Sequence, residues 1–231
     1  MNLSTVADGM DVIYEDEDVL VVAKPAGQHV HPSPGHETGT LSQELAAAYP
    51  EISRIGSEQR PGVVHRLDSQ TSGVMVFARS RRAYFALRKA FESHSGIKKT
   101  YLAILHGSPK PRSGSLTAKI GRKPWDARRM AIGVADGKRA VTHWQTLATR
   151  NGLSLVEFII ETGRMHQIRV TAAHLGAPVV GDELYGDAKA DRRLAWRPGR
   201  HLLHAVSLEF PHPATGRKMA FSVPPPPEFM C

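Results

Sequence analysis

Cysteine is almost absent from this sequence. The one cysteine is Cys231, the last of 231 residues, so the chain has neither a disulfide framework nor a thiolate zinc cluster. No apolar run approaches the length of a membrane span, and the first 18 residues lack the basic region and apolar core of a secretory signal. These absences predict a cytoplasmic protein with no membrane partner.

Several nucleotide and metal motifs are also missing. The sequence has no P-loop and no GxGxxG after a strand, which weakens nucleotide-dependent functions. Histidine is plentiful, however, with 12 in the chain, and one loop holds His29, His31, His36 and Glu37. A metal-dependent hydrolase or nuclease is therefore an alternative, although neither an HExxH motif nor cysteine ligands support it.

Basic residues outnumber acidic residues, and the basic residues are concentrated in two segments. Lys and Arg number 30 against 22 acidic residues, which gives a formal net charge of +8. Residues 1–18 carry six acids and no base, whereas residues 79–99 and 119–139 carry seven bases each, against one and two acids. This pattern favours a polyanionic partner, of which nucleic acid is the commonest. A merely soluble basic protein is the alternative.

The residue pattern predicts one α+β domain over residues 1–231. The expected helices cover residues 41–49, 81–94 and 165–175. The expected strands cover residues 12–14, 19–23, 74–78, 99–106, 141–149, 153–161, 201–210 and 218–223. We expect one hairpin from the strands at 12–14 and 19–23, a second around Arg150-Asn151-Gly152, and a helix cap at Ser80. Many strands follow one another directly, which argues for an antiparallel or mixed sheet. We expect a flexible N-terminus over residues 1–11 and an extended Pro-rich tail over residues 224–231.

Residues 62–73, GVVHRLDSQTSG, are the most informative run. They place Arg66 and Asp68 between an apolar pair and a turn that ends on Gly73, at the edge of the strand expected over residues 74–78. Functional sites tend to lie at such edges. The residues alone leave a second interpretation open, in which Asp68 caps the turn and Arg66 is a solvated charge.

This run resembles the HRLD…TSG signature of the RluA-type pseudouridine synthases. Further matches follow in order: VLVVAKPAGQHVHP at 19–32, KKTYL at 98–102, GRMHQIRVTAAHLGAPVVGDELYG at 163–186 and HLLHAVSLEFPHP at 201–213. The resemblance implies an RNA pseudouridine synthase, an isomerase that needs no cofactor and no metal. It also implies a bent, mixed but mainly antiparallel central sheet with flanking helices and a central active-site cleft.

The resemblance implies the catalytic residues. Asp68 matches the family's essential aspartate, Tyr101 the tyrosine that lies against the target base, and Arg169 the arginine that pairs with the aspartate. A guanidinium can donate hydrogen bonds to both oxygens of a carboxylate, and its charge keeps that carboxylate ionised in a cleft. By spacing alone, Tyr101 would be a half-buried strand residue and Arg169 a solvated helix residue.

The remaining site residues are predicted to contact the RNA. Ile168 would pack on the second face of the uracil, and Arg66 would enter the RNA helix where the uridine leaves, with a plain phosphate contact as its alternative. His65 and Lys99 are expected to assist binding, although Lys24, His65, Thr71 and Ser72 suit scaffold roles better than chemical ones.

A basic stretch supplies further predicted RNA contacts. Residues 120–144 resemble the family segment that contacts RNA, and Trp125 and Met130 lie among its Arg and Lys residues. The predicted contacts are Arg122, Lys123, Arg128 and Arg129. A solvated basic hairpin is the alternative.

The expected partner is a stem-loop of ribosomal or transfer RNA, bound by a monomer. Many relatives carry an N-terminal ribosomal-protein-like domain for which this chain has no room before Val12, so the RNA target stays open. A non-catalytic RNA-binding module would use the same basic surfaces. It would have no use for Asp68, Tyr101 and Arg169 together.

Overall fold

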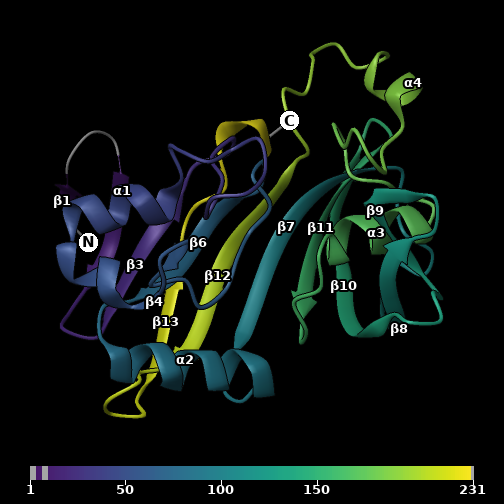
Figure 1. Ribbon diagram of the computed structural model, residues 1–231. Helices are drawn as coiled ribbons and strands as arrows, with labels where there is room; N and C mark the ends of the chain where they lie inside the picture. Colours follow the sequence, from purple (N-terminus) through teal and green to yellow (C-terminus); the bar gives the residue numbers. More distant parts are fainter. Residues whose placement is uncertain (1–3, 7–9, 230–231) are drawn as a thin grey trace. The chain divides into compact units, whose positions relative to one another are not determined.

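The computed structural model describes residues 4–6 and 10–229, and these form two compact units (Figure 1). The first unit comprises residues 1–98 and 205–224, and the second comprises residues 99–204 and 225–231. Strands dominate and pair mainly antiparallel, with few helices, which confirms the predicted α+β class. Within the described ranges, no helix is long and apolar enough to cross a membrane.

The first unit is a sheet with the strand order β1-β2-β3-β6-β12, and β13 pairs with β12. The strands are β1 Ser4–Val6, β2 Met10–Glu15, β3 Val19–Lys24, β6 Ser72–Ala78, β12 Leu203–Pro211 and β13 Lys218–Ser222. The predicted hairpin of β2 and β3 is confirmed. The expected flexible segment is wrong for residues 4–6 and 10–11, because β1 pairs with β2 there. Residues 1–3 and 7–9 lie outside the described range.

The core of this unit forms where helix α2, Arg81–Ser93, packs on fully buried strand residues. Every residue of β6 is buried, as the apolar run predicts, and Val74 and Val76 share a cluster with Leu87 of α2. The helix starts at the predicted cap, where the Ser80 hydroxyl accepts the N–H of Ala83. The shorter elements are α1 Leu41–Ala48, η1 Pro50–Arg54, β4 Gly56–Ser57 and β5 Arg60–Pro61.

The glycine that ends the 62–73 run permits a close approach of two strands. Gly73 has a φ of +125°, and a Cβ added there would lie 2.2 Å from the carbonyl oxygen of Ala205 in β12. Only glycine fits such a position. The loop that carries Asp68 therefore leads into β6 at the point where β6 packs closely against β12.

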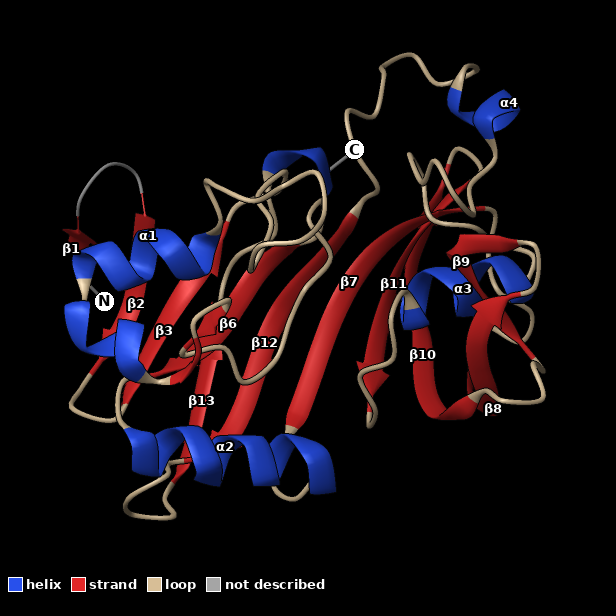
Figure 2. Ribbon diagram, viewed as in Figure 1, coloured by secondary structure: helices blue, strands red, loops and turns tan. Residues whose placement is uncertain are grey.

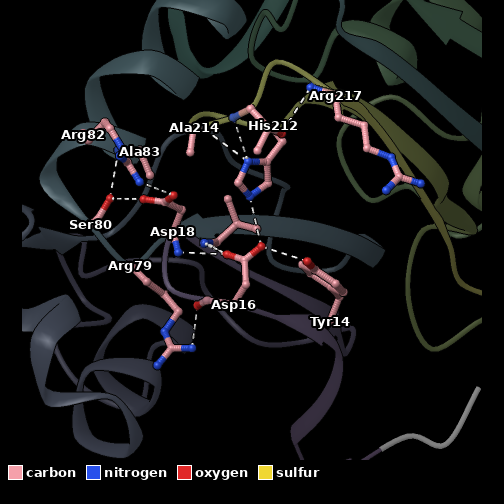
Figure 3. A network of polar contacts seen from close by, with 12 residues as sticks. Tyr14, Asp16, Asp18, Arg79, Ser80, Arg82, Ala83, His212, Ala214 and Arg217 are labelled. Atoms are coloured by element: carbon pink, nitrogen blue, oxygen red, sulfur yellow. Dashed lines mark hydrogen bonds and ion pairs between the residues drawn. The ribbon is translucent and has the colours of Figure 1, made fainter.

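A polar network ties the β2–β3 turn to the segment between β12 and β13 (Figure 3). Oδ1 of Asp16 accepts the backbone N–H groups of Asp18 and Val19, each at 2.8 Å. Oδ2 accepts the hydroxyl of Tyr14 at 2.8 Å and lies 3.0 Å from Nε2 of His212. Burial alone would raise the pKa of Asp16, but these hydrogen bonds outweigh it and hold the pKa below its ordinary value.

The second unit has the strand order β7-β11-β10-β8-β9, with each neighbouring pair antiparallel. The strands are β7 Lys98–His106, β8 Ser113–Lys123, β9 Asp126–Ile132, β10 Lys138–Arg150 and β11 Leu153–Ile160. The predicted hairpin of β10 and β11 is confirmed. Its turn residues Asn151 and Gly152 have φ of 51° and 76°, typical of a type I′ turn.

Helix α3, Gln167–His174, packs against β9 and β10 (Figure 2). It begins two residues later than predicted, because His166 has a left-handed φ of 55° and cannot continue a right-handed helix. The expected extended tail is wrong for its middle part: η2, Pro227–Phe229, is a 3-10 turn with Phe229 buried in an apolar cluster. A short helix α4 covers Ala188–Asp191, and residues 230–231 lie outside the described range.

Candidate active site

Asp68 lies in the turn that leads into β6. The N–H of Thr71 donates to the backbone carbonyl of Asp68 at 3.0 Å, so the main chain of Asp68 helps to close the turn. Its side chain is half-buried, whereas Arg66 is exposed and Leu67 is buried between them. The buried leucine anchors the loop, and the two charged residues on either side are partly or fully accessible.

A buried lysine holds this turn in place. Nζ of Lys24 donates to the carbonyl oxygens of Pro25 at 2.7 Å and Ser69 at 2.8 Å. The N–H of Gly27 donates to the same Ser69 carbonyl at 2.9 Å. The Lys-Pro-Ala-Gly turn and the Asp68 turn are therefore bound to one another, which agrees with the scaffold role expected for Lys24.

His65 is held between a strand and a helix. Its Nε2 accepts the N–H of Val76 at 3.1 Å, and its ring stacks on Phe91 of α2 with centroids 4.5 Å apart. Because a backbone N–H donates to Nε2, the neutral ring carries its proton on Nδ1. These contacts support the scaffold role and do not support the RNA contact predicted for His65.

Tyr101 and Lys99 lie on the same face of β7, since they are two residues apart in a strand. Tyr101 pairs with Phe158 of β11 and is 7% exposed. Nζ of Lys99 donates to the carbonyl oxygen of Thr162 at 3.2 Å. Burial, and then the charge of Arg164, lower the pKa of Lys99 to about 8. A buried ammonium does not support the RNA contact predicted for Lys99.

Arg169 forms a two-pronged pair with a carboxylate that was not among the sequence candidates. Nε and Nη2 each lie 2.7 Å from an oxygen of Asp182, whose side chain is fully buried. The backbone N–H groups of Leu184 and Tyr185 donate to the same carboxylate. Burial would raise the pKa of Asp182, but the hydrogen bond and charge of Arg169, and then these N–H groups, hold it below its ordinary value.

This pair corrects one interpretation of Arg169. The residue is 5% exposed, so it is not a solvated helix residue. Its Nε and Nη2 atoms bind Asp182. Pairing of Asp68 with the rest of the guanidinium stays a prediction.

Gln167 fastens the start of α3. Its Oε1 accepts the hydroxyl of Thr162 at 2.8 Å and the N–H of Arg164 at 3.0 Å. Its Nε2 donates to the carbonyl of Val141 at 2.9 Å and to the hydroxyl of Thr142 at 3.0 Å. The buried amide thus satisfies both its donors and its acceptor. The next two residues, Ile168 and Arg169, are both predicted site residues, and both are buried on this helix.

Asp182 and Tyr185 could have been identified from one signal in the sequence. Both lie in the GDELYG run at 181–186. If Arg169 is buried, physical chemistry requires a buried acid nearby, and this run contains one. The ring of Tyr185 lies 5.3 Å from the guanidinium carbon of Arg169, and its hydroxyl contacts Nδ1 of His166 at 2.9 Å.

The basic hairpin of β8 and β9 exposes most of its predicted RNA contacts. Arg122, Lys123 and Arg128 are exposed, and Arg129 is half-exposed. Asp126 lies 3.7 Å from Nε of Arg128 and 3.4 Å from Nε of Arg129, so it offsets part of their charge. The net charge of the tip is positive.

The histidine-rich loop gives the metal-dependent alternative no support. The rings of His29 and His36 stack with centroids 3.9 Å apart, and Nδ1 of His31 lies 2.9 Å from the carbonyl oxygen of Pro32. Oε1 of Glu37 accepts the N–H of Gly35. Across residues 4–6 and 10–229, no three or more His, Cys, Asp or Glu side chains are grouped so as to hold a metal ion.

Comparison with known proteins identifies the family. The model of the RNA pseudouridylate synthases matches residues 18–174. The chain belongs to this family. It is 40% identical over 95% of its length to an uncharacterised RNA pseudouridine synthase of Synechocystis sp., and 42% identical over 94% to ribosomal large subunit pseudouridine synthase D of Xanthomonas campestris. It spans 67% and 66% of those proteins, about two thirds of each.

A solved structure confirms the fold. The human RNA pseudouridylate synthase domain containing 1 protein is 28% identical to this chain, with a TM-score of 0.75 over 97% of this chain and 86% of that one. The mainly antiparallel pseudouridine synthase fold that the motifs predicted is therefore the fold of this protein.

Proposed function

We propose that the chain is a single catalytic domain that isomerises uridine to pseudouridine in ribosomal or transfer RNA. The observation that carries the proposal is the family match over residues 18–174, which includes Asp68, Tyr101 and Arg169.

Asp68 is the proposed reactive carboxylate. The reaction breaks the bond between the ribose and uracil N1, turns the base and joins the ribose to C5. A proton leaves C5, and N1 takes up a proton in its place. Substrate and product contain the same atoms, so the isomerisation needs no oxidant, reductant or energy source. Asp68 acts at the ribose or at a proton there. The turn bound by Lys24 supports this role because it fixes the carboxylate before the substrate arrives.

Tyr101, Ile168 and Arg169 are the proposed contacts to the target base. Tyr101 offers an aromatic face and a hydroxyl that can receive the C5 proton, and Ile168 offers an apolar contact. Arg169 provides positive charge, aimed by its pair with Asp182. Exposed Arg66 fills the space that the flipped uridine leaves in the RNA stack.

Structured RNA is the proposed substrate. Exposed Arg122, Lys123 and Arg128 suit phosphate contacts, and the name of the Xanthomonas relative favours large-subunit ribosomal RNA over transfer RNA. The proposed form is a monomer without a cofactor, and the proposed compartment is the cytoplasm, where these RNAs function.

The test is the release of tritium from RNA labelled at uridine C5, using ribosomal and transfer RNA transcripts. The wild-type protein should release tritium, and Asp68→Asn should release none while its RNA affinity is preserved, because the change removes the charge and keeps the shape. Appreciable turnover by a pure Asp68→Asn protein would remove Asp68 from the mechanism. Pseudouridine maps from cells with and without the gene would then identify the RNA.

A further inference from the structure

Trp125 is the most exposed large apolar side chain in the described part of the chain. Its relative exposure is 102%, compared with 62% for Phe85 and 48% for Leu147. A side chain of this size normally buries much of its surface on folding. Trp125 therefore contributes no packing to the folded chain, and its position calls for another explanation.

The backbone at Trp125 is also unfavourable for tryptophan. Lys123 pairs with Asp126, so Pro124 and Trp125 form a two-residue loop between β8 and β9. Proline holds its own φ near −65°, and Trp125 has a φ of +71°. These values describe a type II turn, in which the position of Trp125 favours glycine or asparagine. A bulky residue at positive φ is an outlier of the kind that gathers at functional sites.

The charge around Trp125 suits a nucleic acid. Arg122, Lys123 and Arg128 are exposed next to the turn, and the guanidinium of Arg122 donates to the carbonyl of Ala127 across the hairpin. An exposed aromatic face that lies between basic side chains, which bind phosphates, is the usual arrangement for binding unpaired nucleotides. Met130 and Trp144 are buried, so Trp125 alone is an exposed large apolar side chain among residues 120–144.

The hairpin is anchored to the helix that carries Arg169. The N–H of Met130 donates to the hydroxyl of Tyr185 at 2.6 Å, and Met130 packs in one cluster with Val170 of α3. Along an extended strand, Trp125 lies roughly 16 Å from Met130. That length equals about five nucleotide steps of a stacked strand. A nucleobase of the RNA that stacks on Trp125 is thus held at a fixed distance from Arg169 and is separate from the uridine that reacts.

We propose that Trp125 is a stacking platform for one unpaired base of the substrate RNA, several nucleotides from the isomerised uridine. Arg122, Lys123 and Arg128 hold the phosphates on either side of that base. The inference rests on the proposed function only in taking RNA as the substrate. It selects RNA with an unpaired loop over continuous duplex, because only an unstacked base presents its face to the indole.

Trp125→Gly tests this proposal, because glycine removes the ring and relaxes the turn. The probes are a stem-loop RNA with an unpaired loop and a blunt duplex with the same number of phosphates. Trp125→Gly should weaken binding of the stem-loop by about 5- to 150-fold and leave duplex binding nearly unchanged. Trp125→Phe should retain most of the affinity. Leu147→Ala, which removes another exposed apolar side chain, should change neither.

Thermal unfolding separates this role from a structural one. Trp125→Gly should unfold at the same or a higher temperature than the wild type, since glycine adopts a φ of +71° without strain. A lower unfolding temperature would mean that the indole supports the fold, and would overturn the proposal. Wild-type affinity for the stem-loop, or equal losses on both probes, would also overturn it.

Pseudouridine formation distinguishes failure of this proposal from failure of the proposed function. Trp125→Gly should raise KM for loop-containing RNA and leave kcat unchanged, because the contact lies outside the chemistry. A wild-type protein that binds the stem-loop through Trp125 but forms no pseudouridine would refute the function alone. A Trp125→Gly enzyme with unchanged KM would refute the stacking platform alone.

Discussion

Lys99→Met should make the protein more stable at neutral pH, although it removes a hydrogen bond. Burial and the charge of Arg164 lower the pKa of Lys99 from 10.5 to about 8. A shift of this size means that the buried ammonium costs about 3 kcal/mol of folding free energy at pH 7. The lost bond to the carbonyl of Thr162 offsets about 1 kcal/mol. Methionine fills a similar volume, so the net gain should be on the order of 2 kcal/mol.

The gain should depend on pH in a defined direction. Because the folded pKa of Lys99 is the lower one, the unfolded chain binds more protons between pH 8 and pH 10.5. The stability of the wild type therefore rises with pH through this window, relative to Lys99→Met. The penalty of about 3 kcal/mol is fully present below pH 8 and is lost by about pH 10.5. The advantage of Lys99→Met should therefore shrink through this window and reverse, because the wild type keeps the hydrogen bond worth about 1 kcal/mol.

Urea unfolding of both proteins from neutral pH to pH 10.5 measures this difference. The comparison removes the effect of other groups that titrate in the window, since both proteins share them. Parallel stability curves would show that the ammonium carries no burial penalty, and would refute the reasoning. RNA binding supplies a second measurement: Lys99→Met should leave the salt dependence unchanged, whereas loss of a phosphate contact would reduce the log–log slope by about 0.7 to 0.9.

Two further changes test carboxylates whose pKa is lowered in the folded protein. Asp182→Asn should lower the free energy of unfolding by about 3–5 kcal/mol, because the guanidinium of Arg169 is left buried without a counter-charge; wild-type stability in urea would contradict this. Asp16→Asn should be less stable than the wild type at neutral pH, and the gap should close in acid. The lowered pKa of Asp16 gives stability that is present above its ordinary value of 3.8 and is lost as the pH falls below it. A gap that does not change with pH would contradict this reasoning.

Local elements and the family motifs could be predicted from the sequence by itself. The cap at Ser80, the Asn151–Gly152 turn and the alternation of β7 depend on residues near one another in the chain, so their physical causes are visible in the sequence. The ordered motifs identified the family and its reaction for a similar reason, since each motif is a continuous stretch. They also predict Asp68 as the reactive carboxylate.

Only the tertiary structure decided which side chains meet and which face solvent. Arg169 and Asp182 are 13 residues apart, and no helical or strand periodicity joins them. Lys99, predicted to bind RNA, directs its ammonium to Thr162 within the unit. Met130 and Trp125 were equivalent in the sequence, but one is buried and the other fully exposed. Such pairings and exposures depend on contacts between distant segments, and a linear pattern contains no information about the distances that those segments adopt on folding.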